Sequence, residues 1–189
     1  MLLDTIQTIH IRYSCRDFAD KIPSDEDLRI IAKAAVASPS GMNRQLWRVI
    51  VVKNRALIDD LEKEAIKNIA AFTDQSIYER VMSRGGTIFY NAPVMMVIPI
   101  TKAKKAGAEL FDCGIVSENI ALAATAIGID NLICGLAAFA FAENKNAEFK
   151  RRLGFPEGYE IGIAVLLGYA KEPGSKPHES DLSKISFVE

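Results

Sequence analysis

The chain has 189 residues, a length at which a globular protein forms one domain and buries roughly 70% of the surface that its unfolded chain exposes. Its hydrophobic fraction of 49% and charged fraction of 25% are ordinary for a soluble protein, and the formal net charge of -1 creates no field that would attract nucleic acid or an anionic membrane. We therefore expect a single domain over residues 1–189, with neither nucleic acid nor a membrane as a partner.

The cysteine, histidine and N-terminal patterns narrow the class further. Three cysteines without a Cys-x-x-Cys pair predict no disulfide framework, and the two histidines have no spacing that suits a metal. A Cys/His nucleophilic pair stays open by counting, although no local motif supports one. The N-terminus has no basic segment and places Asp4 where a signal peptide would be apolar, which predicts a cytoplasmic protein.

Two capped helices are predicted on either side of the stretch Arg12–Phe18. The first begins after Asp4, because Gln7 follows at the capping-box spacing before an apolar side. The second begins after Ser24, which precedes three acidic residues that complement the positive end of a helix. Pro39 ends this second helix, since a proline pushes the residue before it out of the helical region.

The stretch between these helices carries two arginines four residues apart with a serine midway. Guanidinium forks bind phosphate bidentately, and a hydroxyl adds a further donor. On a helical or turn-like backbone, positions i and i+4 lie on one side, so Arg12, Ser14 and Arg16 are predicted to converge on one anion. The alternative is a solvated surface with local ion pairs to Asp17 and Asp20.

The next part of the chain alternates a loop, a strand and a helix. Residues 38–43 form a short polar loop tethered to the end of the second helix. The continuous β-branched run at 48–53 predicts a buried strand. Asn54 is the predicted N-cap of a helix that extends to the region of Ala71.

The segment 72–86 is the least regular part of the sequence. It mixes polar residues with a possible helical turn and ends in Gly85 and Gly86, so we predict a flexible connection near the mouth of a site. Residues 92–98 form the second predicted strand, which Pro99 ends.

A long helix is predicted over residues 108–127, where it is apolar on most sides and stopped by Gly128. Such a helix must be buried. Its length would suit a membrane span, but the carboxylates of Asp112 and Glu118 and the amide of Asn119 make insertion costly. We therefore expect a central packing helix, which would also suit a subunit interface.

The last elements are a strand, a helix, a strand and an arm. Residues 132–136 predict a short strand, and residues 144–153 a helix with Gly154 just past its end. The stretch 160–169 is rich in Ile, Val and Leu, which predicts a central strand. Residues 171–189 are polar and contain prolines, so we expect an extended arm without a core of its own.

No glycine-rich dinucleotide-binding turn is present, although alternating strands and helices would ordinarily suggest a doubly wound parallel fold. Residues 53–55 and 101–103 follow the first two strands, and neither tripeptide can cradle a pyrophosphate. Phosphate binding must come from side chains, which points again to Arg12 and Arg16.

The two motifs together resemble those of the FMN-dependent nitroreductase family. Arg-x-Ser-x-Arg at residues 12–16, a capped helix and then Pro-Ser-x-x-Asn-x-Gln-x-Trp at 39–47 are similar to that family's pattern, and the likeness in layout covers nearly the whole chain. The resemblance implies an α+β fold with a central mixed, mostly antiparallel sheet flanked by helices. It also implies a homodimer with FMN sites at the interface and a domain-swapped C-terminal arm over 171–189.

The resemblance implies a role for each motif residue. Arg12, Ser14 and Arg16 would hold the FMN phosphate and ribityl chain, and Tyr13 would add a main-chain contact. Residues of the other subunit's loop would touch the flavin ring and ribityl group, namely Pro39, Ser40, Gly41 and Asn43.

The C-terminal half would supply the rest of the cofactor site. One face of the isoalloxazine would lie along Leu132, Ile133, Cys134 and Gly135. The amides of Cys134 and Gly135 would reach flavin N5 and O4, with no side chain acting as a catalytic acid or base. Lys176 and His178 fall where the family places two basic residues that close over the phosphate.

The chain departs from the family pattern at two positions. Leu46 stands where proline usually precedes the tryptophan, and His178 replaces what is commonly arginine. Histidine is a weaker, pH-dependent phosphate partner, so FMN affinity is affected more than the location of the site. Asn68 and Arg84 are the candidates for the contact to the pyrimidine edge of the flavin.

By the same resemblance, hydride would pass from NADH or NADPH to flavin N5 and then to a small-molecule acceptor such as a nitroaromatic or a quinone. The cofactor carries the reactivity, and the two substrates would use one open face in turn, which implies ping-pong kinetics. The alternative from another class is a non-catalytic protein that stores or senses FMN. An oxidase or dehalogenase variant of the same fold would need a lid that recognises one substrate.

Overall fold

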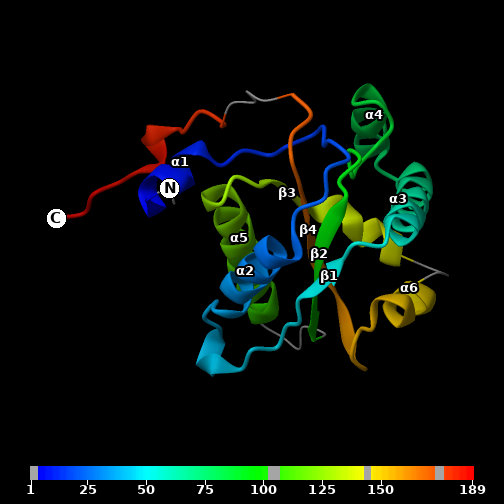
Figure 1. Ribbon diagram of the computed structural model, residues 1–189, viewed down its shortest axis with the longest axis horizontal. Coiled ribbons are helices and arrows are strands. Elements are labelled where there is room, and N and C mark those ends of the chain that lie inside the picture. The colour runs from blue at the N-terminus through cyan, green and yellow to red at the C-terminus, as the bar shows by residue number, and fades with distance from the viewer. Residues whose placement is uncertain (1–3, 102–106, 143–145, 173–176) are drawn as a thin grey trace.

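The computed structural model describes residues 4–101, 107–142, 146–172 and 177–189 (Figure 1). In chain order its elements are α1 (Thr5–Ile11), α2 (Asp25–Val36), η1 (Gly41–Asn43), β1 (Ile50–Val52), α3 (Arg55–Ala70), α4 (Gln75–Ser83), β2 (Val94–Thr101), α5 (Ala108–Ala126), β3 (Asp130–Cys134), η2 (Gly135–Phe141), α6 (Asn146–Leu153), β4 (Tyr159–Gly168) and η4 (Leu182–Lys184). The α+β class predicted from the sequence is confirmed.

The four strands form one sheet in the order β1-β2-β4-β3, and every pairing between named strands is antiparallel. The prediction that residues 160–169 form a central strand is confirmed, since β4 pairs with both β2 and β3. Among the described residues, the one parallel pairing is an isolated bridge between Ser14 and Asn131. The sheet is therefore antiparallel where a mixed, mostly antiparallel one was expected.

Helices cover both faces of the sheet because the central strand β2 is apolar on both sides. Met95 and Val97 face the layer that contains α3 and η2, whereas Met96 and Ile98 face α2 and α5. Alternate residues of a strand point to opposite faces, so a continuous apolar run supplies two cores. Figure 1 shows α2 and α5 on one side of the sheet and α3, α4 and α6 on the other.

The predicted helix boundaries rest on local capping contacts. Each N-cap side chain accepts the backbone N–H three residues later, at 2.9 Å for Asp4, 3.1 Å for Ser24 and 3.0 Å for Asn54. Gly128 and Gly154 follow α5 and α6 with φ of 77° and 73°, a conformation that favours glycine. These five predictions are confirmed.

The prediction of a flexible connection over residues 72–86 is wrong, because α4 occupies most of it. The Asp74 carboxylate caps this helix by accepting the Ser76 N–H at 3.0 Å. Val81 is buried in the core beside α3. A short helix with one packed apolar side gives a weak periodic pattern, so tertiary packing decides its formation.

Two strand predictions also need correction. Pro99 does not end β2, which continues to Thr101 with a shift of register between Ile98 and Pro99. Proline is compatible with a strand at such an irregularity, and the Pro99 carbonyl still accepts the Arg48 N–H at 2.9 Å. The run before α3 was expected to be a buried strand, but β1 is a short edge strand in which Val51 is 38% exposed.

The long helix α5 lies against α1, α2 and the sheet, yet it is not buried on all sides of the single chain. Its residues Leu110, Phe111 and Ile115 are 58%, 73% and 40% exposed. Complete burial was predicted, so this part of the prediction is wrong for one chain. Within the described residues, no helix combines the length and apolarity that a membrane crossing requires.

Gly168, the last residue of β4, packs closely against the buried rings of Pro93 and Phe18. A Cβ at this position would lie 2.8 Å from Pro93 Cδ and 2.9 Å from Phe18 Cδ1. Gly168→Ala should therefore lower the free energy of unfolding by about 1–3 kcal/mol, because overpacking forces the neighbouring rings to shift. Urea denaturation of the ligand-free protein measures this change. Gly135→Ala is the matched control, since its Cβ would meet no atom within 4 Å, and equal midpoints for the two variants would contradict the prediction.

Candidate functional site

The stretch Arg12–Phe18, called the clamp segment below, is extended rather than helical. It runs beside β3 through the bridge between Ser14 and Asn131. Figure 1 shows this part of the chain passing from α1 towards α4 before it turns back to α2. Alternate residues of an extended chain share a face, so Arg12, Ser14 and Arg16 lie on the same face of the clamp segment. The helical spacing predicted for them is wrong, although the three still lie together.

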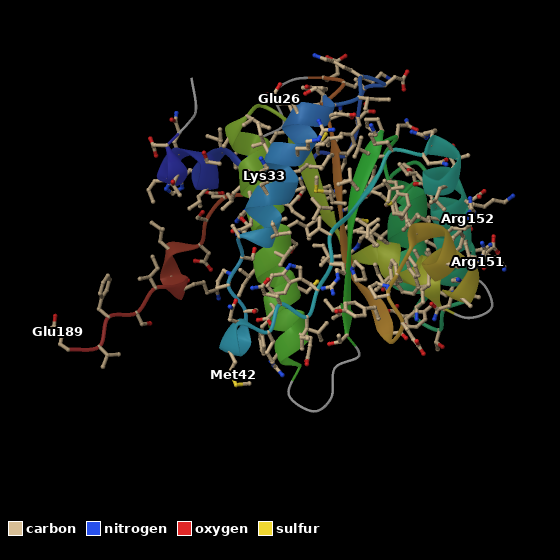
Figure 2. The ribbon with its side chains drawn as sticks, turned by 60° about the horizontal axis from the view of Figure 1, so that its bottom comes forward. Glu26, Lys33, Met42, Arg151, Arg152 and Glu189 are labelled. Carbon is tan, nitrogen blue, oxygen red and sulfur yellow. The ribbon has the colours of Figure 1, made fainter. Side chains whose placement is uncertain are left out.

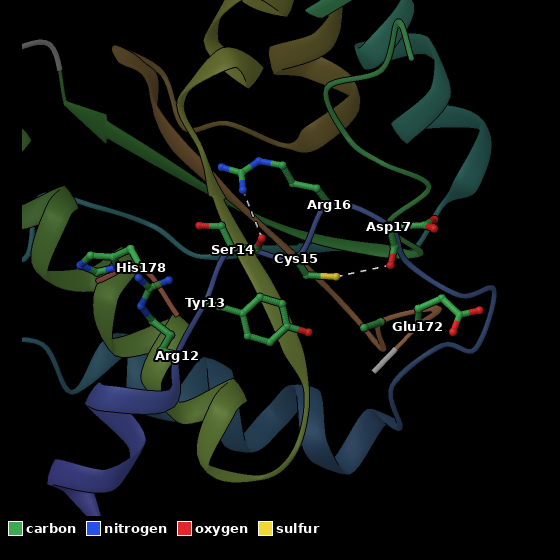
Figure 3. A pocket seen from close by; sticks show the side chains of 9 residues that line it. Arg12, Tyr13, Ser14, Cys15, Arg16, Asp17, Glu172 and His178 are labelled. Carbon is green, nitrogen blue, oxygen red and sulfur yellow. Dashed lines mark hydrogen bonds between the residues drawn. The ribbon is translucent and has the colours of Figure 1, made fainter. Parts of the chain in front are cut away.

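An open cavity of about 550 Å³, called the clamp cavity, lies against this segment (Figure 3). Its lining residues are Arg12, Tyr13, Ser14, Cys15, Arg16, Asp17, Ala170, Glu172 and His178. Figure 3 shows the side chains of Arg12 and His178 at one end and Glu172 at the other. The cavity thus gathers the predicted anion-binding residues of the clamp segment and one basic residue of the C-terminal arm. Lys176 lies outside the described residues.

Acidic side chains offset part of the positive charge. Arg12 Nε lies 3.7 Å from Glu118 Oε1 on α5, and the Arg12 side chain is 16% exposed. The Arg16 guanidinium donates to the Ser14 carbonyl oxygen at 3.4 Å. Asp17 and Glu172 add two further carboxylates at the cavity wall. Sequence reasoning missed both glutamates as site residues, because both lie far from the arginines in the sequence.

Asp130 anchors the clamp segment to the sheet. Its Oδ1 accepts the Tyr13 hydroxyl at 2.7 Å, and its Oδ2 accepts the Ala170 N–H at 2.7 Å. One carboxylate therefore joins the start of β3, the clamp segment and the chain that leaves β4. Burial, reinforced by the bond to Asp130, raises the pKa of Tyr13, so its hydroxyl remains a protonated donor. In the sequence, the one sign of this role is a carboxylate at the start of an apolar strand.

The three thiols are buried and protonated. Burial raises the pKa of Cys134 to about 11 and that of Cys113 to about 12, and it raises the pKa of Cys15 as well. The thiolate is the nucleophilic form of cysteine, and none of these environments stabilises it. The Cys/His nucleophile left open by the sequence therefore finds no support in the structure.

The polar loop 38–43 packs on α5 and does not line the clamp cavity of its own chain. The Ser38 hydroxyl accepts the Asn119 side-chain amide at 2.9 Å. The Gly41 N–H donates to Asp112 Oδ1 at 3.2 Å. Two polar residues of α5, Asp112 and Asn119, therefore hold the loop in place.

The tip of this loop is strained and faces outward. Met42, Asn43 and Gln45 have φ of 53°, 52° and 49°, in the left-handed region that side chains disfavour. The Ser40 hydroxyl accepts the Gln45 N–H at 2.9 Å, and the Gln45 side-chain amide donates to Asn43 at 2.8 Å. Figure 2 shows Met42 projecting from the molecule together with the exposed loop. Pro39 is also exposed. Strain of this kind is typical of functional loops.

The stretch Leu132–Gly135 ends in an open position. The side chains of Leu132 and Cys134 are buried in the core. Gly135 is exposed and begins η2, so the predicted continuation of the strand to Leu136 is wrong. What this stretch presents to a ligand is the backbone around Gly135, with free space beside it.

A second cavity, of about 390 Å³, lies between α4 and the start of η2, and is called the α4 cavity below. Its lining residues are Asp74, Ser76, Ile77, Arg80, Val81, Arg84, Tyr90 and Leu136. Arg84, one candidate for the pyrimidine edge, thus borders a cavity. Asn68, the other, donates its side-chain amide to the carbonyls of Phe139 and Ala142 at 2.8 and 3.1 Å, which holds η2 against α3.

Known proteins share this sequence and architecture. The profile of the Nitroreductase family matches residues 9–169. An Archaeoglobus fulgidus protein named "Putative NADH dehydrogenase/NAD(P)H nitroreductase" is 30% identical over 172 residues, which cover 89% of this chain and 87% of the relative. A crystal structure of a nitroreductase with bound FMN from Desulfitobacterium hafniense DCB-2 is 52% identical, with a TM-score of 0.95 over 100% of both chains.

A further structure extends the likeness at lower identity. A nitroreductase with bound FMN from Bacteroides fragilis NCTC 9343 is 26% identical, has a TM-score of 0.88, and is matched over 99% of this chain and 100% of that chain. The family profile includes the clamp segment and the loop 38–43 and extends past the end of β4. On these grounds the chain belongs to the Nitroreductase family.

Proposed function

We propose that the protein is an FMN-dependent oxidoreductase that transfers hydride from NADH or NADPH to nitroaromatic, quinone or similar small-molecule acceptors. The clamp cavity is the observation that carries this proposal, because two guanidiniums, a hydroxyl and His178 border one space. Such donors fit a phosphate monoester. The FMN in the two related crystal structures and the NAD(P)H in the name of the Archaeoglobus relative support the choice of cofactor and co-substrate.

The donors that border the clamp cavity suit the phosphate of FMN. Arg12 and Arg16 would bind its phosphate, with Ser14 donating to a phosphate or ribityl oxygen and Tyr13 fixed beside them by Asp130. The flavin ring would lie along the Leu132–Gly135 backbone, where free space adjoins the last residue. The buried side chains of this stretch set the position of the backbone and take no further part.

FMN supplies the chemistry when it is bound, because its N5 atom can accept and return a hydride. The chain's own residues then need only to bind, orient and polarise. The N–H groups of Cys134 and Gly135 would donate towards N5 and O4, a form of electrostatic preorganisation. No thiol or carboxylate need act as an acid or base, which agrees with the buried, protonated state of the cysteines. The nicotinamide and the acceptor would use one open face in turn, in a ping-pong cycle.

We further propose a homodimer in which each chain is one flavin-binding domain over residues 1–189. The exposed apolar side chains of α5 form a patch next to the point where Asp112 holds the loop 38–43. Apolar patches of this kind are typical of subunit interfaces. Joining two chains through α5 would carry Pro39, Ser40, Gly41 and Asn43 to the partner's flavin.

The C-terminal arm supports the same assembly. Leu182, Phe187 and Val188 are 73%, 89% and 97% exposed, and Figure 2 shows Glu189 well away from the rest of the chain. An arm with apolar side chains and no core of its own gains most by packing on a partner. We therefore propose that residues 171–189 cross to the other subunit. The cytoplasmic location stays a prediction.

Anaerobic reduction tests the enzymatic proposal. The purified protein should be yellow, and NADH or NADPH should bleach its flavin band within seconds, after which a nitroaromatic or quinone should restore the colour. The measurement is stopped-flow absorbance. A yellow protein that neither nicotinamide bleaches would instead be a protein that stores or senses FMN. A colourless protein that cannot be loaded with FMN would contradict both.

A further inference from the structure

The α4 cavity carries an excess of positive charge. Its charged lining residues are Asp74, Arg80 and Arg84, so one negative and two positive charges leave a formal sum of one positive charge. Arg80 lies on α4 and Arg84 is the residue that caps its C-terminal end, and both line the cavity. Asp74 is already engaged, because its carboxylate accepts the Ser76 N–H as the N-cap of α4.

Neither guanidinium has a structural task that explains its position. Among the described residues, neither side chain forms an ion pair or a hydrogen bond, although Arg80 is near enough to Asp74 for its charge to act on that carboxylate. Arginines near a helix C-terminus can also serve the last carbonyls. Here the carbonyls of Val81 and Met82 already accept the N–H groups of Gly86 and Gly85 at 3.0 and 3.1 Å.

The remaining walls of the cavity are mostly apolar. Ile77, Val81, Tyr90 and Leu136 line it together with the two arginines. Small-molecule sites typically measure about 300–1,000 Å³ and combine apolar walls with a few placed polar groups. The α4 cavity, at about 390 Å³, has this composition. A flat apolar ring that bears an anionic group matches it.

The cavity adjoins the place assigned above to the flavin ring. Leu136 directly follows Gly135, whose outer side is open. The Tyr90 carbonyl accepts the Phe18 N–H at 3.0 Å, which joins the cavity wall to the end of the clamp segment. A molecule in the α4 cavity would therefore lie beside the proposed cofactor.

We infer that the α4 cavity selects acceptors that are aromatic carboxylates, with Arg80 and Arg84 binding the carboxylate and the apolar wall holding the ring. This assignment rests on the proposed function, narrows its substrate class, and gives Arg84 to the acceptor in place of the pyrimidine edge of the flavin. The same guanidiniums could bind the extra phosphate of NADPH, which shares the anionic chemistry. The lining favours the acceptor, because one cavity combines the two arginines with apolar side chains that suit an aromatic ring.

The test compares 4-nitrobenzoate with nitrobenzene, which have the same ring and nitro group and differ in the carboxylate. Binding of each to the FMN-loaded protein is measured calorimetrically without any nicotinamide, for the wild type and for the double variant Arg80→Gln/Arg84→Gln. Removal of the charged partners should weaken 4-nitrobenzoate binding about tenfold or more. Nitrobenzene binding should stay the same. Arg29→Gln/Arg151→Gln, at exposed positions on α2 and α6, removes the same two positive charges elsewhere and is the charge-matched control.

Kinetics and a conservative variant complete the test. The double variant should lower kcat/KM for 4-nitrobenzoate relative to nitrobenzene through KM, and Arg80→Lys/Arg84→Lys should restore part of the difference. Equal losses for both acceptors would overturn the assignment. A lowered preference for NADPH over NADH with an unchanged acceptor ratio would also overturn it. Failure of the proposed function appears separately, as flavin that no nicotinamide bleaches, while the binding measurement remains interpretable.

Discussion

Replacing Arg12 and Arg16 together by alanine should weaken FMN binding by roughly two to four orders of magnitude, because each charge-assisted hydrogen bond contributes about 1.5–3 kcal/mol. The two arginines share a face of the clamp segment and line the same cavity. The FMN affinity of both proteins is measured by calorimetry, by titrating FMN into protein from which the flavin has been removed. The variant should purify colourless.

The fold should survive this change. Arg16 is exposed, and the Glu118 partner of Arg12 keeps access to water with 46% of its side chain exposed. The urea midpoint of the ligand-free variant should therefore match that of the wild type, since partly exposed ion pairs contribute little to stability. Arg16→Lys keeps the charge without the planar fork, so its FMN affinity should fall between those of the wild type and the Arg12→Ala/Arg16→Ala protein. Arg29→Ala/Arg151→Ala removes two other arginines and is the control for net charge. Full FMN occupancy of the Arg12→Ala/Arg16→Ala protein would show that these arginines are surface residues only.

Mixing two inactive proteins should restore activity to about a quarter of the wild-type sites. Arg16→Ala removes a phosphate partner from the clamp cavity, whereas Ser40→Trp places a bulky ring on the loop that the proposed dimer carries to the other chain's flavin. In a heterodimer of these chains, one site collects both lesions and the other collects none. Random 1:1 exchange yields half heterodimers with one intact site of two, hence about a quarter.

The structure supports this arrangement through the position of the loop. Within one chain the loop 38–43 is held on α5 by Asp112 and Asn119 and takes no part in the clamp cavity. The exposed side chains of Leu110 and Phe111 adjoin its anchor. Subunit exchange is verified by mass spectrometry of differently tagged chains, and flavin-dependent activity is then measured. Verified heterodimers without activity would mean that each flavin is held within a single chain, and the loop would lose its assignment to the cofactor.

A mixture of Arg16→Ala with Arg12→Ala is the control, because both lesions lie in the clamp segment. Each heterodimer site there carries one lesion, so no recovery is expected.

Capping and glycine signals in the sequence determined five of the helix ends directly. Asp4, Ser24 and Asn54 cap the helices predicted for them, and Gly128 and Gly154 follow the ends of two others. These contacts join residues about three apart, so they depend little on the rest of the fold. The same holds for the two motifs, whose residue types and spacing alone indicated an anion site and a polar loop.

The sequence also predicted the inner strands β2 and β4, because a strand buried on both faces must be continuously apolar. The sequence could not show which helix covers which face. It also missed α4 and the passage of β2 through Pro99, since both depend on neighbours: the packing of Val81 beside α3 and the pairing of the Pro99 carbonyl with Arg48. Local propensity is a weak guide where a packed neighbour supplies most of the stability.

Only the tertiary structure decided how the candidate site is assembled. The sequence selected Arg12, Ser14 and Arg16 but placed them on a helical face, whereas the bridge to Asn131 holds them in an extended chain. Asp130 reaches Tyr13 across 117 residues of sequence, and Asp112 reaches the loop across 71. Contacts at such separations form only when the sheet and α5 bring distant segments together, and their energy leaves no local pattern in the chain. The α4 cavity has the same origin, because its two arginines acquire an apolar floor only where α4 meets the start of η2.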